Sequence, residues 1–398
     1  MAFSPPSTLE AAVATAGRAI DSASTALREL SLDIHSHPEL NFEEHHAHAV
    51  LTDYLEAAGF SVDRGAFELP TAFQAVAGTG SPVIALFSEF DALPGIGHAC
   101  GHNLIAISGV ATAVGLKAAL GEGNGTIVLL GSPAEEGGGG KALMIERGAL
   151  EGVDAALMLH PAPVGNGLPH LIAAEHLEVR YHGKGTHAGA TPWMGVNALD
   201  AMVLAYTNIS VLRQQLHTTD RIHGVITSGG EKANIIPDFT AAQWIIRAQA
   251  AAELTDLKRR VMACFEAAAA ATGCTLETRV LGPAYDDLRQ NEVIGRRYLA
   301  AIERLGAAHV SHEIGMDSGA VTDMGNVSYN VPSIHPVFGI PATDGNHTPG
   351  FTAAAATPEA HEATVMASKA LAETALELVF DPALLARAKA EFEATVRV

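Results

Sequence analysis

The chain has 398 residues and a net charge of −20, with 48% hydrophobic and 17% charged residues. This composition excludes an intrinsically disordered chain, and the acidic charge argues against binding to nucleic-acid phosphates. Three cysteines are too few for a disulfide framework, the first residues lack a secretory pattern, and no apolar run approaches a membrane span of roughly 20 residues. We therefore expect a cytoplasmic protein with no membrane or nucleic-acid partner.

The first part of the chain alternates between helical spacing and short, almost wholly apolar runs. Apolar runs of this length are typical of strands buried on both faces of a parallel sheet. Strands that alternate with helices predict βαβ units. The predicted strands are 73–76, 83–87, 126–130 and 155–159, and the predicted helices are 7–32, 42–58, 102–120 and 141–150.

The pattern changes after about residue 171. Between 173 and 284 the predicted order is strand, helix, strand, strand, helix, strand, which is the order of a ferredoxin-like antiparallel unit. After this segment the α/β pattern resumes. The sequence thus predicts a mostly parallel α/β domain of residues 1–172 and 285–398, with an α+β domain of residues 173–284 inserted into it.

Several of the 19 histidines fall in the predicted helix 42–58. His45, His46 and His48 share an amphipathic pattern with Glu43 and Glu44. Charged positions on one side of a helix usually face water. We interpret this group as a solvated helix face.

Potential metal ligands follow three of the predicted buried strands. Cys100 and His102 come after the strand 83–87, Glu135-Glu136 after 126–130, and His160 directly after 155–159. The carboxyl ends of parallel strands meet at one edge of a sheet, where α/β proteins bind ligands. Alone, Cys100 and His102 could equally be a buried thiol beside a capping histidine.

The two adjacent glutamates suggest two different roles, a metal ligand and a general base. Like charges side by side repel, and a metal ion bound to one of them relieves the conflict. The other then serves as a general base. With His347 from a later loop, the donors form a sulfur, nitrogen and oxygen set that suits two zinc ions or similar divalent ions, with manganese or cobalt as alternatives. Two metals and a general base indicate hydrolysis by an activated water.

Two alternative functions would use the same residues. Cys100 could be a nucleophile with His102 as its base, although a residue two positions away rarely orients a base correctly. The chain could also be a non-catalytic metal-binding protein, but then the second glutamate has no purpose.

The ordered motifs resemble those of the M20 family of metallopeptidases and amidohydrolases, in the branch that uses a cysteine ligand. Within it the chain is most similar to the group containing M20 domain-containing protein 2 and aminobenzoyl-glutamate hydrolase. The zinc-exopeptidase-like fold of this family carries an inserted lid, or dimerisation, domain. The matching stretches are 35–40, 89–94, 98–103, 131–136, 159–161, 185–188, 234–238, 322–328 and 347–351.

The resemblance implies a role for each matching residue. Glu135 would be the catalytic base, and His187 of the lid would stabilise the oxyanion, commonly in the site of a partner subunit. Asn234 and Arg247 would contact the substrate, and Asp91 would orient a ligand. Glu89 stands where many relatives carry a ligand histidine, while His98 and His335 have no assigned family role. The implied metal ligands are Cys100, His102, Glu136, His160 and His347.

The resemblance also implies the reaction and its partners. The expected substrate is a small amide with a free carboxylate, either an aminoacyl or N-acyl amino acid or dipeptide. Aminobenzoyl-glutamate is the alternative. A homodimer through the lid domain is expected.

Overall fold

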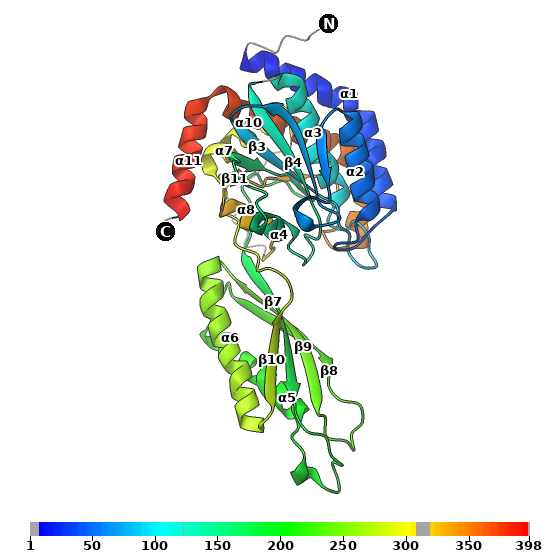
Figure 1. Cartoon of the computed structure of the whole chain (residues 1–398), viewed down its shortest axis with the longest axis vertical. Coiled ribbons are helices and arrows are strands. Elements are labelled where there is room, and N and C mark those ends of the chain that lie inside the picture. Colours follow the sequence, from blue (N-terminus) through cyan, green and yellow to red (C-terminus); the bar gives the residue numbers. More distant parts are fainter. Residues whose placement is uncertain (1–7, 122, 308–318, 397–398) are drawn as a thin grey trace. The chain divides into compact units, whose positions relative to one another are not determined.

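The structure is a computed structural model that describes residues 8–121, 123–307 and 319–396. These residues form two compact units, drawn in Figure 1. Unit 1 comprises the described parts of Met1–His170, Arg289–Met316 and Asp323–Val398. Unit 2 comprises Leu171–Leu288 and the described part of Asp317–Thr322. Each unit has its own hydrophobic core.

Unit 1 is built on a six-stranded sheet in the order β1-β2-β4-β3-β5-β11. The neighbours β4, β3, β5 and β11 run parallel, whereas β1 and β2 pair antiparallel at one edge. The apolar runs of β3 and β4 are almost wholly buried because both faces of the sheet are covered. The strands are β1 (Ser61–Arg64), β2 (Phe73–Thr79), β3 (Val83–Glu89), β4 (Gly125–Ser132), β5 (Ala155–Leu157) and β11 (Ser333–Ile334), with a separate parallel pair β6 (His160–Ala162) and β12 (Val337–Gly339).

The helices of unit 1 come from both ends of the chain. The earlier ones are α1 (Leu9–Ser36), α2 (His45–Ala57), the short 3-10 turn η1 (Ala66–Glu68), α3 (His102–Leu120) and α4 (Gly140–Glu146). The later ones are α7 (Glu292–Arg304), α8 (Met324–Ser328), α9 (Pro349–Ala354), α10 (Pro358–Phe380) and α11 (Pro382–Val396).

Helix α3 is the central helix of unit 1 and explains the small residues of its sequence. A Cβ on Gly109 would lie 2.3 Å from Ser88 Oγ and 2.7 Å from the Phe87 carbonyl oxygen, so only glycine allows α3 this close to β3. By length and composition α3 could cross a membrane, which corrects the expectation that no run approaches that length. Since 83% of that window is buried within the protein, the apolar surface of α3 is accounted for by core packing.

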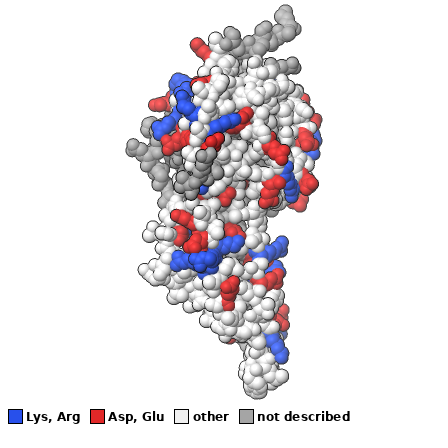
Figure 2. All heavy atoms as spheres, turned by 60° about the vertical axis from the view of Figure 1, so that its left-hand side comes forward, with Lys and Arg blue, Asp and Glu red and all other residues white. Residues whose placement is uncertain are grey.

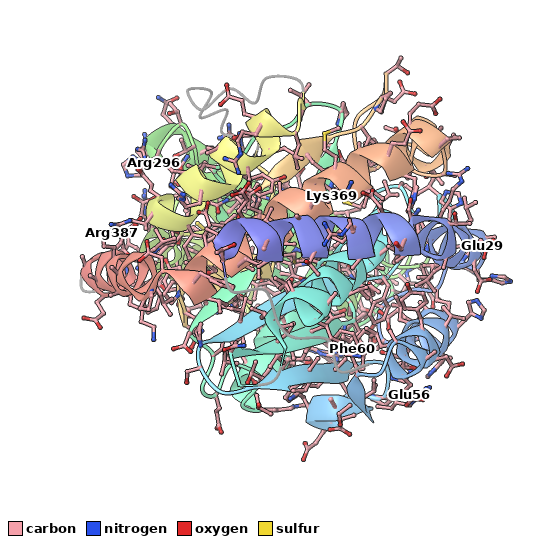
Figure 3. All side chains as sticks on the ribbon, turned by 90° about the horizontal axis from the view of Figure 1, so that it is seen from above. Glu29, Glu56, Phe60, Arg296, Lys369 and Arg387 are labelled. Carbon is pink, nitrogen blue, oxygen red and sulfur yellow. The ribbon has the colours of Figure 1, made fainter. Side chains whose placement is uncertain are left out.

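Helices from distant parts of the sequence pack together around α3. Both α1 and α10 contact α3, and they also contact each other. Figure 3 shows α1 crossing the unit beside α10, from which Lys369 projects. Lys369 Nζ lies 2.5 Å from Asp21 Oδ1 of α1 and joins these two helices at the surface.

Unit 2 is an α+β sandwich with one antiparallel sheet in the order β10-β7-β9-β8. This order follows from the strand-helix-strand-strand-helix-strand sequence of a ferredoxin-like unit. The predicted fold class, a mostly parallel α/β domain with an inserted α+β domain, is confirmed. The elements are β7 (Ala173–His182), η2 (Pro192–Met194), α5 (Ala198–Leu212), η3 (Arg213–Gln215), β8 (Arg221–Ser228), β9 (Phe239–Ala248), α6 (Ala251–Thr272) and β10 (Thr275–Val280).

Charged side chains of both signs are interspersed on the face drawn in Figure 2. The prediction of a solvated face on α2 is wrong for one of its members. Glu44 is fully buried, whereas Glu43 and His45 are exposed. His46 and His48 are half-buried. The partners that bury Glu44 are described with the site.

Candidate metal centre

The loops after three neighbouring parallel strands meet at one edge of the sheet of unit 1. The loop after β3 carries Cys100 and leads into α3, whose first residue is His102. Gly101 between them has φ 79°, and a Cβ there would lie 2.6 Å from Pro161 Cγ. Glycine therefore permits the turn that presents both ligands. Glu135 and Glu136 follow β4, and His160 begins β6 just after β5.

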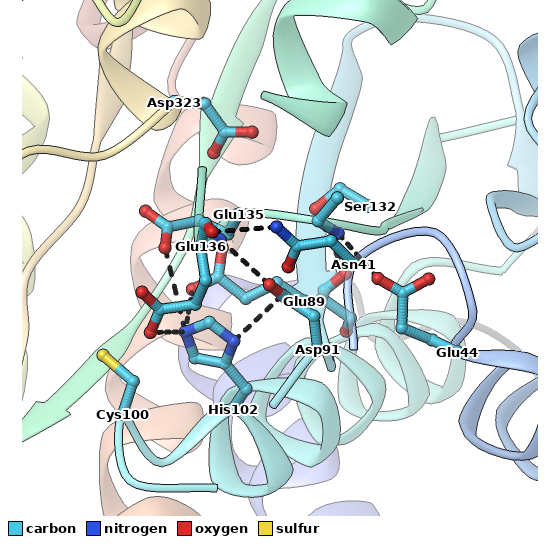
Figure 4. Close-up of polar contacts among 12 residues, drawn as sticks. Asn41, Glu44, Glu89, Asp91, Cys100, His102, Ser132, Glu135, Glu136 and Asp323 are labelled. Carbon is cyan, nitrogen blue, oxygen red and sulfur yellow. Dashed lines mark hydrogen bonds and ion pairs between the residues drawn. The ribbon is translucent and has the colours of Figure 1, made fainter. Parts of the chain in front are cut away.

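The structure brings together five predicted ligands, most of which Figure 4 draws. His160 Nε2 lies 3.5 Å from Cys100 Sγ. His347 Nε2, from the loop before α9, lies 3.2 Å from Glu136 Oε1. His102 Nε2 lies 3.9 Å from the same Glu136 oxygen. Such separations are close to those between neighbouring ligands of one zinc ion, where metal–ligand bonds are about 2.0–2.3 Å.

Two overlapping groups of ligand atoms share the cysteine. One is formed by Cys100, His102 and His160, and the other by Cys100, Glu136 and His347. Within the described residues, His102 Nε2 and Glu136 Oε1 are buried and make no hydrogen bond. Buried polar atoms without a hydrogen bond are costly unless another partner binds them. These residues therefore fit a divalent metal ion.

The electrostatics favour the thiolate form of Cys100. Burial alone would raise the pKa of the Cys100 thiol, but the adjacent His160, helped by the nearby His102 and His347, brings it well below its usual range. Contacts with Cys100 and Glu136 raise the pKa of His347 to about 10, and a bound metal ion would displace the proton that this imidazole holds. A thiolate is the form of cysteine that binds a metal.

Asp91 orients His102. Its Oδ1 lies 3.0 Å from His102 Nδ1, and its Oδ2 accepts a hydrogen bond of 2.9 Å from the Glu136 backbone N–H. Burial opposes the charged carboxylate, but His102 brings the Asp91 pKa below its usual value. A carboxylate on one ring nitrogen leaves the other free to bind a metal. Asp91 thus fixes His102 with Nε2 directed towards Glu136.

The pKa values of both glutamates are raised. For Glu135 the cause is burial, followed by the negative charges of Glu89 and Glu136. For Glu136 the cause is burial and then Cys100. A carboxylate with a raised pKa binds a proton more strongly than an ordinary one, which is the property that a general base requires.

A buried lysine that the sequence analysis did not single out neutralises the acidic side of the site. The Lys141 ammonium is fully buried and lies 2.5 Å from Glu89 Oε2 and 2.7 Å from Asp323 Oδ1. Despite burial, the carboxylates of Asp323 and Glu89 raise the pKa of Lys141. Glu89 Oε1 also lies 3.4 Å from His102 Nε2. No local pattern could reveal this, because Lys141 simply follows four glycines.

The structure also places the two histidines that had no assigned role. His98 is buried against the Ile34 carbonyl oxygen, 3.1 Å from Nε2, and burial lowers its pKa to about 3. His335 is buried with its ring centroid 5.7 Å from that of His160. Burial, then His160, lowers the His335 pKa well below its usual value. Both are neutral residues that pack around the centre.

Glu44 holds the backbone beside Glu135 and Glu136. Its Oε1 accepts hydrogen bonds from the N–H groups of Ala134 and Phe42, each 2.9 Å long, and its Oε2 accepts one of 2.8 Å from the Thr71 hydroxyl. Ala134 has φ 57°, so this short turn into Glu135 is strained and needs such support. Burial, then the charge of Asp91, raises the Glu44 pKa to about 7.

This shift predicts a pH dependence of stability. The pKa of Glu44 is about 7 in the folded protein and 4.5 for an ordinary glutamate. Below pH 4.5 this difference does not change the free energy of unfolding, and between pH 4.5 and about 7 it lowers that free energy increasingly. Glu44→Gln lacks this titration. We therefore expect the free energy of unfolding of Glu44→Gln, relative to that of the parent protein, to be about 2–3 kcal/mol more favourable at pH 7.5 than at pH 4.5. Urea unfolding at both pH values, with equal metal content, measures the difference. An unchanged difference would contradict the assignment.

The three remaining predicted residues lie in unit 2. His187 and Asn234 are exposed and adjacent, because His187 pairs with Ile235 and the Ala188 N–H donates to the Asn234 carbonyl over 3.0 Å. Arg247 lies near the other end of β9, half-buried, and donates from Nη1 to the Gly319 carbonyl over 2.5 Å. Within unit 2 the structure therefore separates Arg247 from the other two.

Comparison with known proteins gives a consistent result. Residues 85–360 match the family described as Peptidase family M20/M25/M40. The chain is 44% identical over 395 residues to a Mus musculus Xaa-Arg dipeptidase, covering 95% of this chain and 91% of the relative. It is 37% identical over 288 residues to one of the subunits of the p-aminobenzoyl-glutamate hydrolase of Escherichia coli, covering 66% of this chain and 60% of the relative.

Solved structures share the fold. One is a Bacillus subtilis protein described as a dinuclear metal binding peptidase from the M20 family, with a TM-score of 0.68 and 24% identity, covering 90% of this chain and 99% of that one. Another is an aminobenzoyl-glutamate utilization protein from Klebsiella pneumoniae, with a TM-score of 0.68 and 19% identity, covering 90% and 97%.

Proposed function

We propose, since the chain belongs to peptidase family M20/M25/M40 and is a metal-dependent hydrolase of amide bonds, that it cleaves dipeptides with a basic C-terminal residue. The observation that carries this proposal is the likeness, along nearly the whole chain, to the mouse and human Xaa-Arg dipeptidases. The acidic charge of the protein supports it, since a field of that sign attracts cationic substrates. Aminobenzoyl-glutamate, the alternative, carries two carboxylates and would be repelled.

We assign the two overlapping ligand groups to two divalent ions, with zinc the best match to a donor set of thiolate, imidazole and carboxylate. Cys100 would be shared, His102 and His160 would complete one group, and Glu136 and His347 the other. When bound, the ions supply Lewis acidity and lower the pKa of water.

Side chains of the protein would carry out the proton transfers and bind the substrate. Glu135 takes a proton from the attacking water and passes it to the leaving amine, which is the usual work of a general base that later acts as an acid. Asp91 holds His102 in place throughout. His187 would donate a hydrogen bond to the oxyanion, and Asn234 and Arg247 would bind the substrate's carbonyl and carboxylate.

The geometry of unit 2 supports a homodimer. The nine residues from Phe239 to Arg247 are separated by eight steps along the strand and span about 26 Å, and His187 pairs with Ile235, which lies still further from Arg247. A dipeptide spans only about 7 Å. One substrate thus cannot touch His187 and Arg247 of the same chain. Strand β8 is an edge strand with exposed Val225 and Ile226, which offers a surface to a second copy.

Mixing two inactive variants tests this arrangement. If His187 acts in the partner's site, His187→Ala and Glu135→Gln chains should complement, because each mixed dimer has one intact site. Random reassortment should restore about a quarter of the parent activity. The measurement is activity after the two variants are dissociated together and reassembled, with each variant treated alone as the control. No recovery from demonstrated mixed dimers would place His187 in its own chain's site.

The substrate is tested by release of free amino acid from a matched set of amides. The set contains dipeptides ending in arginine or lysine, the same dipeptides ending in leucine, N-acetyl amino acids and aminobenzoyl-glutamate. We expect kcat/KM to be highest for the basic dipeptides. A preference for aminobenzoyl-glutamate or for N-acetyl amino acids would overturn the substrate proposal. The cytoplasmic location remains a prediction.

A further inference from the structure

A second cluster of potential metal ligands lies away from the centre described above, where the loop between α1 and α2 joins the two helices. It consists of Asp33 in the last turn of α1, His37 directly after that helix, and His46 in the first turn of α2. Asp33 Oδ1 lies 3.1 Å from His37 Nδ1, and Asp33 Oδ2 lies 3.1 Å from His46 Nε2. The two imidazole rings are 4.3 Å apart between centroids.

The chemistry of this cluster suits a transition metal. One ligand atom from each residue lies within 4.8 Å of the other two. Two imidazoles and one carboxylate form a three-ligand set that binds zinc and leaves further positions for water. His37 Nδ1 also lies 2.8 Å from the Asp33 carbonyl oxygen. A carbonyl accepts but cannot donate, so Nδ1 carries a proton in the absence of an ion, and an ion bound to Nδ1 would displace that proton.

The backbone that carries the cluster is held in place. Glu39, in the intervening loop, accepts hydrogen bonds from the backbone N–H groups of His46 (2.8 Å) and Ala47 (3.0 Å) and so caps the start of α2. The carbonyl end of α1 contributes a partial negative charge that favours a cation. Asp33, His37 and His46 are partly exposed, so their side chains can adjust to an ion without breaking the core.

We propose that Asp33, His37 and His46 form an ancillary site for one transition-metal ion of the zinc class, separate from the catalytic centre. The alternative without a metal is a surface carboxylate that accepts hydrogen bonds from two neutral histidines. It accounts for the two contacts of 3.1 Å, but it predicts no affinity for a metal, which makes the two readings separable by experiment.

The position of this site gives it a consequence for the catalytic centre. The loop between His37 and His46 supports the backbone of that centre at three points. Asn41 Nδ2 donates to the Glu136 carbonyl oxygen over 2.8 Å, and the Glu39 carbonyl oxygen accepts from Ala92 N–H over 2.8 Å. Glu44 holds Ala134 in the same way. An ion bound at the ancillary site would tie together the two ends of this supporting loop.

Zinc stoichiometry tests the proposal. Protein with its catalytic ions in place is dialysed against micromolar free zinc, and the metal per chain is measured by mass spectrometry. We expect the parent protein to bind one zinc more per chain than the double variant His37→Gln, His46→Gln. His45→Gln is the matched control, because His45 lies next to His46 on α2 but pairs only with Glu43 in the described structure. It should keep the additional zinc.

A second measurement separates loss of the site from loss of the fold. Excess zinc should raise the Tm of the parent protein and of His45→Gln by a few degrees but leave that of the double variant unchanged, since an ion that binds the folded state stabilises it. All three proteins should keep their dipeptidase activity before zinc is added. If the double variant does not fold, Asp33→Asn replaces it, with the same expected loss of one zinc. Equal zinc content in the parent protein and the double variant, or in the parent protein and Asp33→Asn, would overturn the proposal.

Discussion

Replacing Glu135 by glutamine should lower kcat by about 10²–10⁴-fold, the range typical of a lost general base. The side chain is almost fully buried, and its Oε2 lies 4.0 Å from His102 Nε2, beside the metal-ligand groups. Burial and the charges of Glu89 and Glu136 raise its pKa, so its carboxylate accepts a proton readily. Glutamine keeps the size of the side chain but cannot accept a proton.

The metal content of Glu135→Gln shows whether Glu135 is a general base or a metal ligand. Because Glu136 and not Glu135 is assigned to a metal ion, Glu135→Gln should keep the metal content of the parent protein. The matched control is Glu146→Gln, an exposed glutamate on α4 that should leave kcat unchanged. Loss of a metal ion in Glu135→Gln would instead make Glu135 a ligand. Unchanged kcat would remove it from the mechanism.

Replacing Lys141 by methionine should destabilise the protein by about 3–5 kcal/mol, the cost of breaking a buried ion pair from one side. Lys141 is fully buried between Glu89 and Asp323, which are also fully buried. Its backbone N–H also donates to Asp323 Oδ2 over 2.8 Å. Methionine fills the same space but leaves two carboxylates without their counter-charge. Urea unfolding at neutral pH measures the loss.

A surface pair supplies the control. Lys389 pairs with Asp154 but is 45% exposed, so Lys389→Met should cost less than about 1 kcal/mol. Adding Glu89→Gln and Asp323→Asn to Lys141→Met should recover part of the lost stability, because the uncompensated charges are then removed. A loss below about 1 kcal/mol for Lys141→Met would show that the cluster is not a stabilising ion network.

The parts of the fold that the sequence predicts are those set by local pattern. The buried runs in β3, β4 and β5 contain no charged side chain before their last residues, which identified them as central parallel strands. Their shared direction then predicted that Cys100, Glu136 and His160 converge at one edge. The structure brings these three residues together as expected, and the family resemblance rests on the same motifs.

The parts that the sequence could not predict depend on partners far along the chain. Glu44 looked like a member of a solvated helix face, but its side chain reaches the backbone of Ala134, 90 residues away. Lys141 is buried only because Glu89 and Asp323, 52 and 182 residues away, compensate its charge. Periodicity describes which side of an element faces the core, but it does not show where a buried charge finds its partner.

We propose that this chain hydrolyses dipeptides with a basic C-terminal residue and uses two divalent ions held by Cys100, Glu136 and three histidines. The most direct test is to remove metal with a chelator, dialyse the chelator away, and titrate zinc, manganese or cobalt back while following arginine release from a dipeptide ending in arginine. We predict no activity without metal and a rise that saturates near two equivalents bound at the catalytic centre. Full activity of the metal-free protein would contradict the claim.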